Sequence, residues 1–174
     1  EGFDMEFASN ITLAALFQQV LVGLSRTTIL FIVASGLSLV LGVLRIPNVA
    51  HGSLYMIGAF LTYTIATLFG QSALGFWLSL IVAPLGVALI SFAVERGLFC
   101  HLYEREHMML LLFTFAFSLV FGDMVKLIWG SDYRSLVAPV FLQGSFSIGG
   151  LPFPRYNLFL LIIGPLVAAG LWFL

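Results

Sequence analysis

No formal charge interrupts the chain between Arg45 and Glu95, a stretch of 49 residues. A membrane-spanning helix needs about 20 consecutive apolar residues, so this stretch is long enough for two such helices. Gly70, Gln71 and Ser72 lie near its middle, and glycine beside short polar residues is typical of a turn. The sequence therefore predicts two membrane helices joined by a short turn.

The composition of the whole chain agrees with a location in lipid. Of its 174 residues, 61% are hydrophobic and 9% are charged, with a net charge of −1. Ordinary globular domains are roughly 45–50% apolar and about 25% charged, so too little charge remains here to cover a soluble surface. The seven Lys and Arg residues are scattered and cannot form a phosphate-binding patch. These observations exclude a soluble enzyme, a disordered tail and a nucleic-acid-binding protein, and they leave an integral protein of the lipid bilayer.

Five hydrophobic segments are predicted to be helices, because backbone groups in lipid must be hydrogen-bonded within their own segment. A β-barrel would need strands of about ten residues that alternate in polarity. The predicted fold is thus an all-α, polytopic transmembrane protein with about five membrane segments, forming one domain over residues 1–174. The first segment contains Arg26, so we expect its beginning along the membrane interface and its span from about Thr27. The segments are residues 17–44, 53–69, 76–94, 108–128 and 156–174.

The longest polar connection, residues 130–155, is expected to be an ordered loop. Alternation in residues 141–148 predicts a small β-hairpin that turns at Gly144 and Ser145. With five spans the termini lie on opposite sides of the membrane. The positive-inside rule then favours an outside N-terminus by one basic residue.

Polar residues in an apolar chain are the first candidates for function. Pro47, Asn48, His51 and Gly52 follow the first segment. Proline lacks an amide hydrogen and glycine adds backbone freedom, so a broken helix is predicted. Such a break is tolerated only inside protein or beside a water-filled cavity, and it often lines a transport pathway. The alternative is a plain loop in which His51 packs or caps a helix.

Two other clusters of titratable residues are candidates for an ion-coupling site or a metal site. Asp123 and Lys126 are three residues apart, which allows an exposed intrahelical ion pair or a buried ion pair that couples transport to an ion. A metal site formed by His101, Glu104 and His107 is conceivable, but this spacing is common by chance, and the sequence has no His-Glu-x-x-His pattern. We expect a solvated connector there and no metal site.

The known motifs of several enzyme classes are missing from the sequence. The chain has no P-loop, its only lysine being Lys126, and no Gly-x-Ser-x-Gly elbow. Cys100 is its only cysteine, which leaves no partner for a disulfide within the chain. We therefore expect no enzyme activity and no cofactor.

Small residues recur every four positions in two segments and predict close helix packing in lipid. The alternative is chance, because small residues are common in this chain. The residues are Ala34, Ser38 and Gly42 in the first segment and Ser118 and Gly122 in the fourth.

One stretch carries a family resemblance. Residues 48–58, Asn-Val-Ala-His-Gly-Ser-Leu-Tyr-Met-Ile-Gly, closely resemble the Asn-Phe-Ala-His-Gly-x-x-Tyr-Met-x-Gly signature of the branched-chain amino acid ABC transporter permeases. Residues 36–42 are similar to that family's first span, and residues 130–134 to its external loop after the fourth span. Val49 departs from the usual phenylalanine. The chain thus resembles the N-terminal part of the first of the paired permease subunits.

The resemblance implies a multi-pass permease subunit of the bacterial inner membrane with a partial ABC importer fold. Such a subunit forms the translocation pathway with a second permease subunit. Two cytoplasmic ATPase subunits drive it, and a periplasmic substrate-binding protein delivers the substrate. The implied substrates are branched-chain amino acids or related compounds such as urea, short amides or aromatic acids.

The resemblance also bears on the length of the chain. Family members carry several more spans and an Arg-rich segment that docks the ATPase, so we expect this chain to be truncated or a fragment. Two other functions remain open from the residues alone: an ion-coupled secondary carrier or channel subunit that uses Asp123 or His51, and a membrane scaffold that transports nothing.

Overall fold

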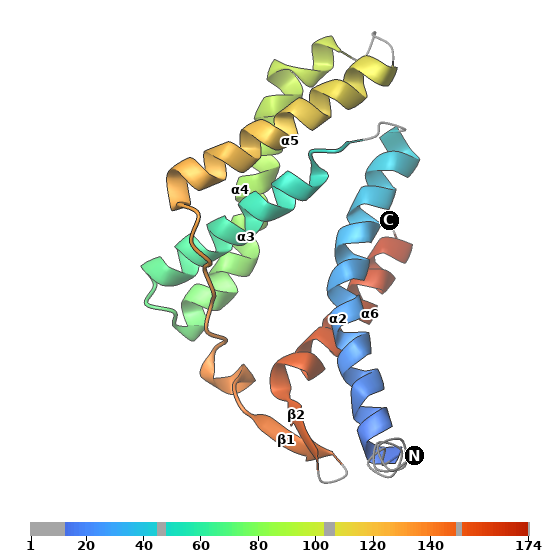
Figure 1. Cartoon of the computed structure of the whole chain (residues 1–174), viewed down its shortest axis with the longest axis vertical. Helices are drawn as coiled ribbons and strands as arrows, with labels where there is room; N and C mark the ends of the chain where they lie inside the picture. Colours follow the sequence, from blue (N-terminus) through green and yellow to red (C-terminus); the bar gives the residue numbers. More distant parts are fainter. Residues whose placement is uncertain (1–12, 45–47, 103–106, 149–150, 174) are drawn as a thin grey trace, which may run out of the picture. The chain divides into compact units, whose positions relative to one another are not determined.

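The computed structural model describes residues 13–44, 48–102, 107–148 and 151–173. It divides into two compact units, the first comprising Glu1–Ala34 with Val140–Leu174 and the second Ser35–Pro139. The first unit holds most of helix α2 together with strands β1 and β2 and helix α6, and the second holds helices α3, α4 and α5 (Figure 1). The predicted helical fold is confirmed, and the described residues after α5 contain one small β-hairpin.

Five long helices correspond to the five predicted segments. They are α2 (Leu13–Leu39), which continues into a π-helical turn η1 (Val40–Leu44), α3 (His51–Leu68), α4 (Ala73–Gly97), α5 (His107–Trp129) and α6 (Arg155–Trp172). Helix α2 runs without a break past Thr27, so the expected change there from an interfacial segment to a span is not a change in secondary structure.

Four helices in the described ranges are long and apolar enough to cross a membrane. Helix α3 has 18 residues and is not one of these four. The four candidate spans are Ala15–Val43, Ala73–His101, Met108–Trp129 and Arg155–Trp172.

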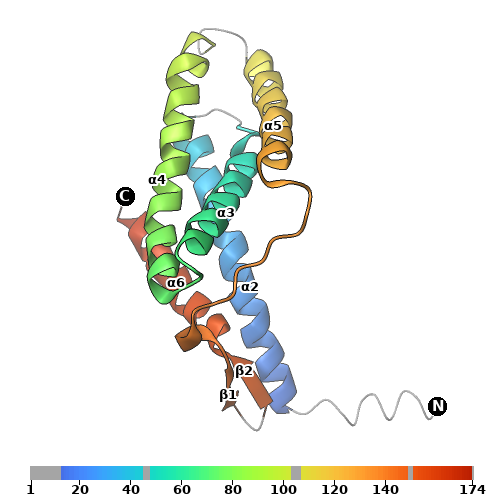
Figure 2. The same ribbon diagram turned by 90° about the vertical axis from the view of Figure 1, so that its left-hand side faces the viewer.

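Helices α3 and α4 form an antiparallel pair around the predicted turn (Figure 2). Gly70 and Gln71 both have positive φ angles, 63° and 54°, which reverse the chain after α3. Ser72 then caps α4, because its side chain accepts a hydrogen bond from the Gly75 N–H at 3.2 Å. A side chain at Gly75 would lie 2.8 Å from Cβ of Phe69, so glycine lets the two helix ends approach closely. The turn predicted at residues 70–72 is confirmed.

The core of the second unit lies between α3 and α5. Its buried residues are Ile57 of α3 and Phe121 and Val125 of α5. Outside this core, large apolar side chains are exposed along every long helix. An exposed apolar surface of this extent is what a helix presents to lipid or to another membrane subunit.

The β-hairpin of the first unit pairs β1 (Ser145–Ile148) with β2 (Leu151–Pro154). A hairpin is therefore present in this connection, but the one predicted within residues 141–148 is wrong, both in its first strand and in its turn at Gly144 and Ser145. Gly144, with φ of 82°, precedes β1, and its carbonyl accepts a hydrogen bond from Arg155 N–H at 3.1 Å. The chain reverses instead between Ile148 and Leu151.

Two contacts connect α2 to the rest of the first unit. Gln18 Nε2 donates a hydrogen bond to the Pro152 carbonyl of the hairpin at 2.6 Å. Farther along α2, buried Thr28 faces Gly164 of α6, where an added Cβ would lie 2.8 Å from Thr28 Cγ2. A glycine at this crossing brings the two helices closer than any side chain would allow.

Candidate functional site

The predicted helix break begins with Asn48. Its side-chain oxygen accepts a hydrogen bond from Ala50 N–H at 3.0 Å, and its carbonyl accepts one from His51 N–H at 3.3 Å. This turn leads directly into α3, so Asn48 organises the start of the helix. Pro47 lies outside the described residues.

His51 is the first residue of α3 and is half-buried. Its ring lies against Gly36, where an added Cβ would be 3.3 Å from His51 Cε1. Gly52 is exposed, and a side chain there would meet nothing within 4 Å in the described part of the chain. The structure thus brings Asn48 and His51 together at one helix start. Gly52 takes no part in the contacts described for them.

Helix α3 and Val49 just before it are joined to α5 by hydrogen bonds with a constant sequence offset of 65 residues. A constant offset means that the two helices run parallel and in register. Spacings of four and eleven residues repeat the same face of a helix, since eleven residues make about three turns. The bonded pairs are Val49–Thr114 (3.3 Å), Ser53–Ser118 (2.7 Å) and Thr64–Trp129 (2.7 Å).

Ser118 therefore does pack closely against a neighbouring helix, as its small size predicts. The other small residues do not act in the same way within the described chain. Ala34, Ser38 and Gly42 are exposed, and an added Cβ at Gly42 or Gly122 would meet nothing within 4 Å. The four-residue spacing alone does not distinguish a small residue that packs against a neighbouring helix, such as Ser118, from an exposed one, such as Ser38.

Asp123 and Lys126 form an ion pair on α5, with 3.2 Å between Lys126 Nζ and Asp123 Oδ1. The side chains are 81% and 65% exposed, respectively, in the chain by itself. The arrangement matches an intrahelical surface pair, and it differs from the buried pair considered from the sequence.

No group of three or more His, Cys, Asp and Glu side chains that could hold a metal ion occurs among the described residues. His101 contacts its neighbour Cys100, with 3.1 Å between Cys100 Sγ and His101 Nδ1. Glu104 lies outside the described residues.

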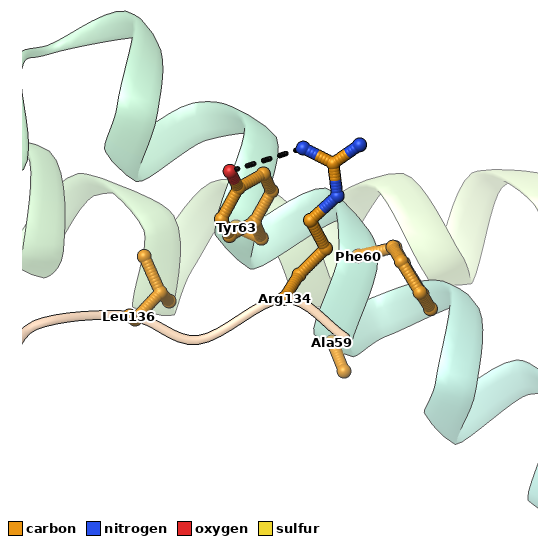
Figure 3. A pocket seen from close by; sticks show the side chains of 5 residues that line it. All are labelled: Ala59, Phe60, Tyr63, Arg134 and Leu136. Carbon is orange, nitrogen blue, oxygen red and sulfur yellow. Dashed lines mark hydrogen bonds between the residues drawn. The ribbon is translucent and has the colours of Figure 1, made fainter. Parts of the chain in front are cut away.

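A pocket of about 200 Å³ lies in the second unit between α3 and the segment that follows the end of α5 (Figure 3). Arg134 reaches over it from the segment after α5. Its guanidinium carbon Cζ lies over the Tyr63 ring, 5.6 Å from the ring centroid. The guanidinium donates hydrogen bonds to Tyr63 Oη at 3.5 Å and to the Trp129 carbonyl at 3.0 Å. The pocket is lined by Ala59, Phe60, Tyr63, Arg134 and Leu136.

Sequence reasoning did not identify this pocket. Arg134 falls within residues 130–134, which resemble a family loop, and Tyr63 falls within the predicted segment 53–69. The available signal was a lone cation just past the predicted end of a span, because such a residue lies close to the neighbouring helix ends.

Comparison with known proteins places the chain among transport proteins. Residues 19–174 match the family described as "Branched-chain amino acid transport system / permease component". The chain is 24% identical over 164 residues to the high-affinity branched-chain amino acid transport system permease protein BraD of Pseudomonas aeruginosa, which covers 88% of this chain and 53% of that protein. It is 26% identical over 137 residues to the permease proteins LivH of Salmonella typhimurium and Escherichia coli, covering 76% of this chain and 44% of each.

The chain therefore spans about half the length of the curated relatives that it matches. No solved structure matches it.

Proposed function

Because the chain belongs to the family of branched-chain amino acid transport permeases, we propose that it is a membrane-spanning permease subunit of an ABC importer. It forms the translocation pathway together with a second permease subunit in the bacterial inner membrane. Its cargo is a branched-chain amino acid or a related small polar or amide compound. The single observation that carries this proposal is the family match over residues 19–174.

The energy source lies on partner chains in this proposal. The sequence has no P-loop, so two cytoplasmic ATPase subunits hydrolyse ATP and a periplasmic substrate-binding protein supplies the cargo. The chain's own contribution is conformational, because a permease pair changes between outward-open and inward-open states by rigid movement of packed helices. The apolar surfaces of α2, α4, α5 and α6 fit contact with lipid and with a second permease.

The orientation follows from the positive-inside rule, with the N-terminus outside. With α3 taken as a fifth span beside the four candidate spans, the Asn48 turn faces the cytoplasm, and α3 and α5 both run from inside to outside. Their parallel hydrogen-bonded pairing supports this common direction. The pocket beside Arg134, at the end of α5, then faces outward.

We assign the helix break at Pro47, Asn48, His51 and Gly52 to the lining of the transport pathway. Its support is the ordered turn at Asn48 and the packing of His51 on Gly36. Asn48→Ala and His51→Ala variants should lose transport more than membrane insertion. Equal loss of both would show a purely structural role.

Uptake of radiolabelled leucine tests the proposal in cells that carry or lack the gene for this chain. Uptake should require the chain, the binding protein and an intact P-loop lysine in the partner ATPase, and a protonophore should not abolish it. Uptake that continues without the ATPase and collapses with the ion gradient would reject the importer and favour a secondary carrier. Competition with urea, short amides and aromatic acids then identifies the cargo class.

A further inference from the structure

The pocket beside the end of α5 combines an apolar wall with one cation. Ala59, Phe60 and Leu136 supply apolar surface, and Tyr63 adds an aromatic face. Arg134 is the only charged residue among those that line it. A volume of about 200 Å³ is below the roughly 300–1,000 Å³ of drug-sized sites, so the pocket suits a molecule the size of a single amino acid.

The guanidinium of Arg134 is held in place at this pocket. Its two hydrogen bonds come from Nη1 and Nη2, to Tyr63 Oη and to the Trp129 carbonyl, and its Cζ atom lies over the Tyr63 ring. Trp129 is itself fixed, because its Nε1 donates to Thr64 Oγ1 at 2.7 Å and its ring lies 5.4 Å from the Phe60 ring. A positioned cation loses less freedom when it binds an anion than a mobile one does.

Within the described part of the chain, Arg134 forms no ion pair with a carboxylate within 4 Å, and Asp132 lies two residues before it in the sequence. A guanidinium carries five N–H donors, and the structure uses two of its nitrogens for the bonds above. The remaining donors match the two oxygens of a carboxylate, which arginine binds with a planar fork.

We propose that this pocket binds the carboxylate of a small molecule with a branched apolar body, Arg134 holding the carboxylate and the wall of Phe60 and Leu136 covering the body. This rests on the proposed function for the identity of the ligand, a branched-chain amino acid. On the outward face the pocket is a first docking site for cargo before it enters the pathway.

Leucine binding to the full chain in lipid nanodiscs, measured by equilibrium dialysis with radiolabelled leucine, tests the proposal without any ATPase. Three unlabelled competitors separate the contribution of Arg134 from that of the apolar wall. 4-Methylpentanoate has both the carboxylate and the branched apolar group, 4-methylpentanamide has the branched apolar group without the charge, and acetate has the carboxylate without the branched group. The first should compete at least about ten-fold better than either of the others, since a charge-assisted hydrogen bond and apolar burial both contribute. Equal competition by the amide would overturn the role of the carboxylate.

Variants connect this binding to the residues named. Arg134→Gln should weaken leucine binding about ten-fold or more, and Arg134→Lys should restore part of it, because lysine keeps the charge but loses the fork. Arg155→Gln removes the same charge from the same connection and should bind like the unmodified chain. Unchanged binding in Arg134→Gln would refute the proposal, as would the absence of saturable leucine binding to the unmodified chain at millimolar concentration.

A second pair of variants leaves Arg134 untouched in case its loss disturbs folding. Ala59→Leu fills the pocket from an exposed position on α3 and should weaken binding. Ala116→Leu adds the same bulk to an exposed position of α5 that does not line the pocket and should change nothing. If both bind alike, the pocket is not the site. ATP-dependent uptake that survives Arg134→Gln would leave the importer function standing while this proposal fails.

Discussion

Replacing Gly164 with alanine tests the close crossing of α2 and α6. The added Cβ would lie 2.8 Å from Thr28 Cγ2 and 2.9 Å from Thr28 Oγ1. Non-bonded carbon atoms prefer about 3.5–4.0 Å, so this contact is short by about 0.7 Å or more. Thr28 is short and β-branched, and it cannot rotate out of the way as a long side chain can. The two helices must therefore separate.

Overpacking of this kind costs roughly 1–3 kcal/mol of stability. Alanine also gains about 0.5–1 kcal/mol over glycine inside a helix. Gly170→Ala supplies the matched control on the same helix, because an added Cβ there meets nothing within 4 Å. Gly170 lies in the last turn of α6, so its helix-propensity gain is at most that at Gly164. A lower stability of Gly164→Ala than of Gly170→Ala therefore reports the crossing. We predict that Gly164→Ala is less stable than Gly170→Ala by about 1–3 kcal/mol.

Unfolding in detergent micelles by sodium dodecyl sulfate, followed by circular dichroism, measures this difference. Thr28→Ala removes both clashing atoms, and its hydroxyl bonds only to Leu24 O of its own helix at 3.2 Å. The double variant Gly164→Ala with Thr28→Ala should therefore recover most of the loss. Equal stability of Gly164→Ala and Gly170→Ala, within about 0.5 kcal/mol, would show that the helices do not cross this closely.

Three further predictions concern the second unit. Thr64→Val removes the acceptor of Trp129 Nε1 and should destabilise the fold by about 1 kcal/mol in the same unfolding assay, whereas Thr64→Ser should not. Asp123→Asn breaks an exposed ion pair and should change stability by no more than about 0.5 kcal/mol and leave uptake unchanged; lost uptake would favour ion coupling. Asn48→Ala removes the acceptor for Ala50 N–H and should lower the stability by about 1 kcal/mol, whereas Asn48→Asp keeps an acceptor and should lower it much less. Unchanged stability in Asn48→Ala would show that the turn does not depend on this bond.

The helices were predictable because lipid imposes one strong rule on the sequence. Uncharged runs of about 20 residues have few alternatives to helix, and the turn at Gly70 and Gln71 carried its own local signal. The register between α3 and α5 had no such signal. It depends on hydroxyl groups such as Ser53 and Ser118 meeting across a helix pair, whereas other hydroxyls, such as those of Thr27 and Thr62, bond to carbonyls of their own helix.

The hairpin turn was misplaced for a definite reason. Pro152 and Pro154 argue against a strand in the sequence, since proline cannot donate to a ladder. The register places them opposite Ser147 and Ser145. Arg155 N–H bonds to Gly144 O, and hydrogen-bonded pairs alternate with non-hydrogen-bonded pairs along an antiparallel ladder. The next pair, Ser145 with Pro154, and then Ser147 with Pro152 are therefore non-hydrogen-bonded pairs. Both prolines fall at positions where no donor is needed. Strand pairing therefore tolerates them, and the sequence pattern concealed the second strand.

Of the candidate site, the sequence could predict the location of Asn48 and His51 at a helix start but not what their side chains contact. The pocket beside Arg134 joins residues about 70 positions apart, Tyr63 and Arg134, and a single sequence holds no record of that pairing.

The central claim is that this chain works as a permease subunit powered by partner ATPases. Proteoliposomes that contain the chain, its second permease and the ATPases, with ATP inside and binding protein outside, measure it most directly. The account predicts leucine accumulation that requires ATP and the binding protein, persists without any ion gradient, and stops when the ATPase P-loop lysine is replaced. Accumulation driven by an ion gradient in the absence of ATP would contradict it.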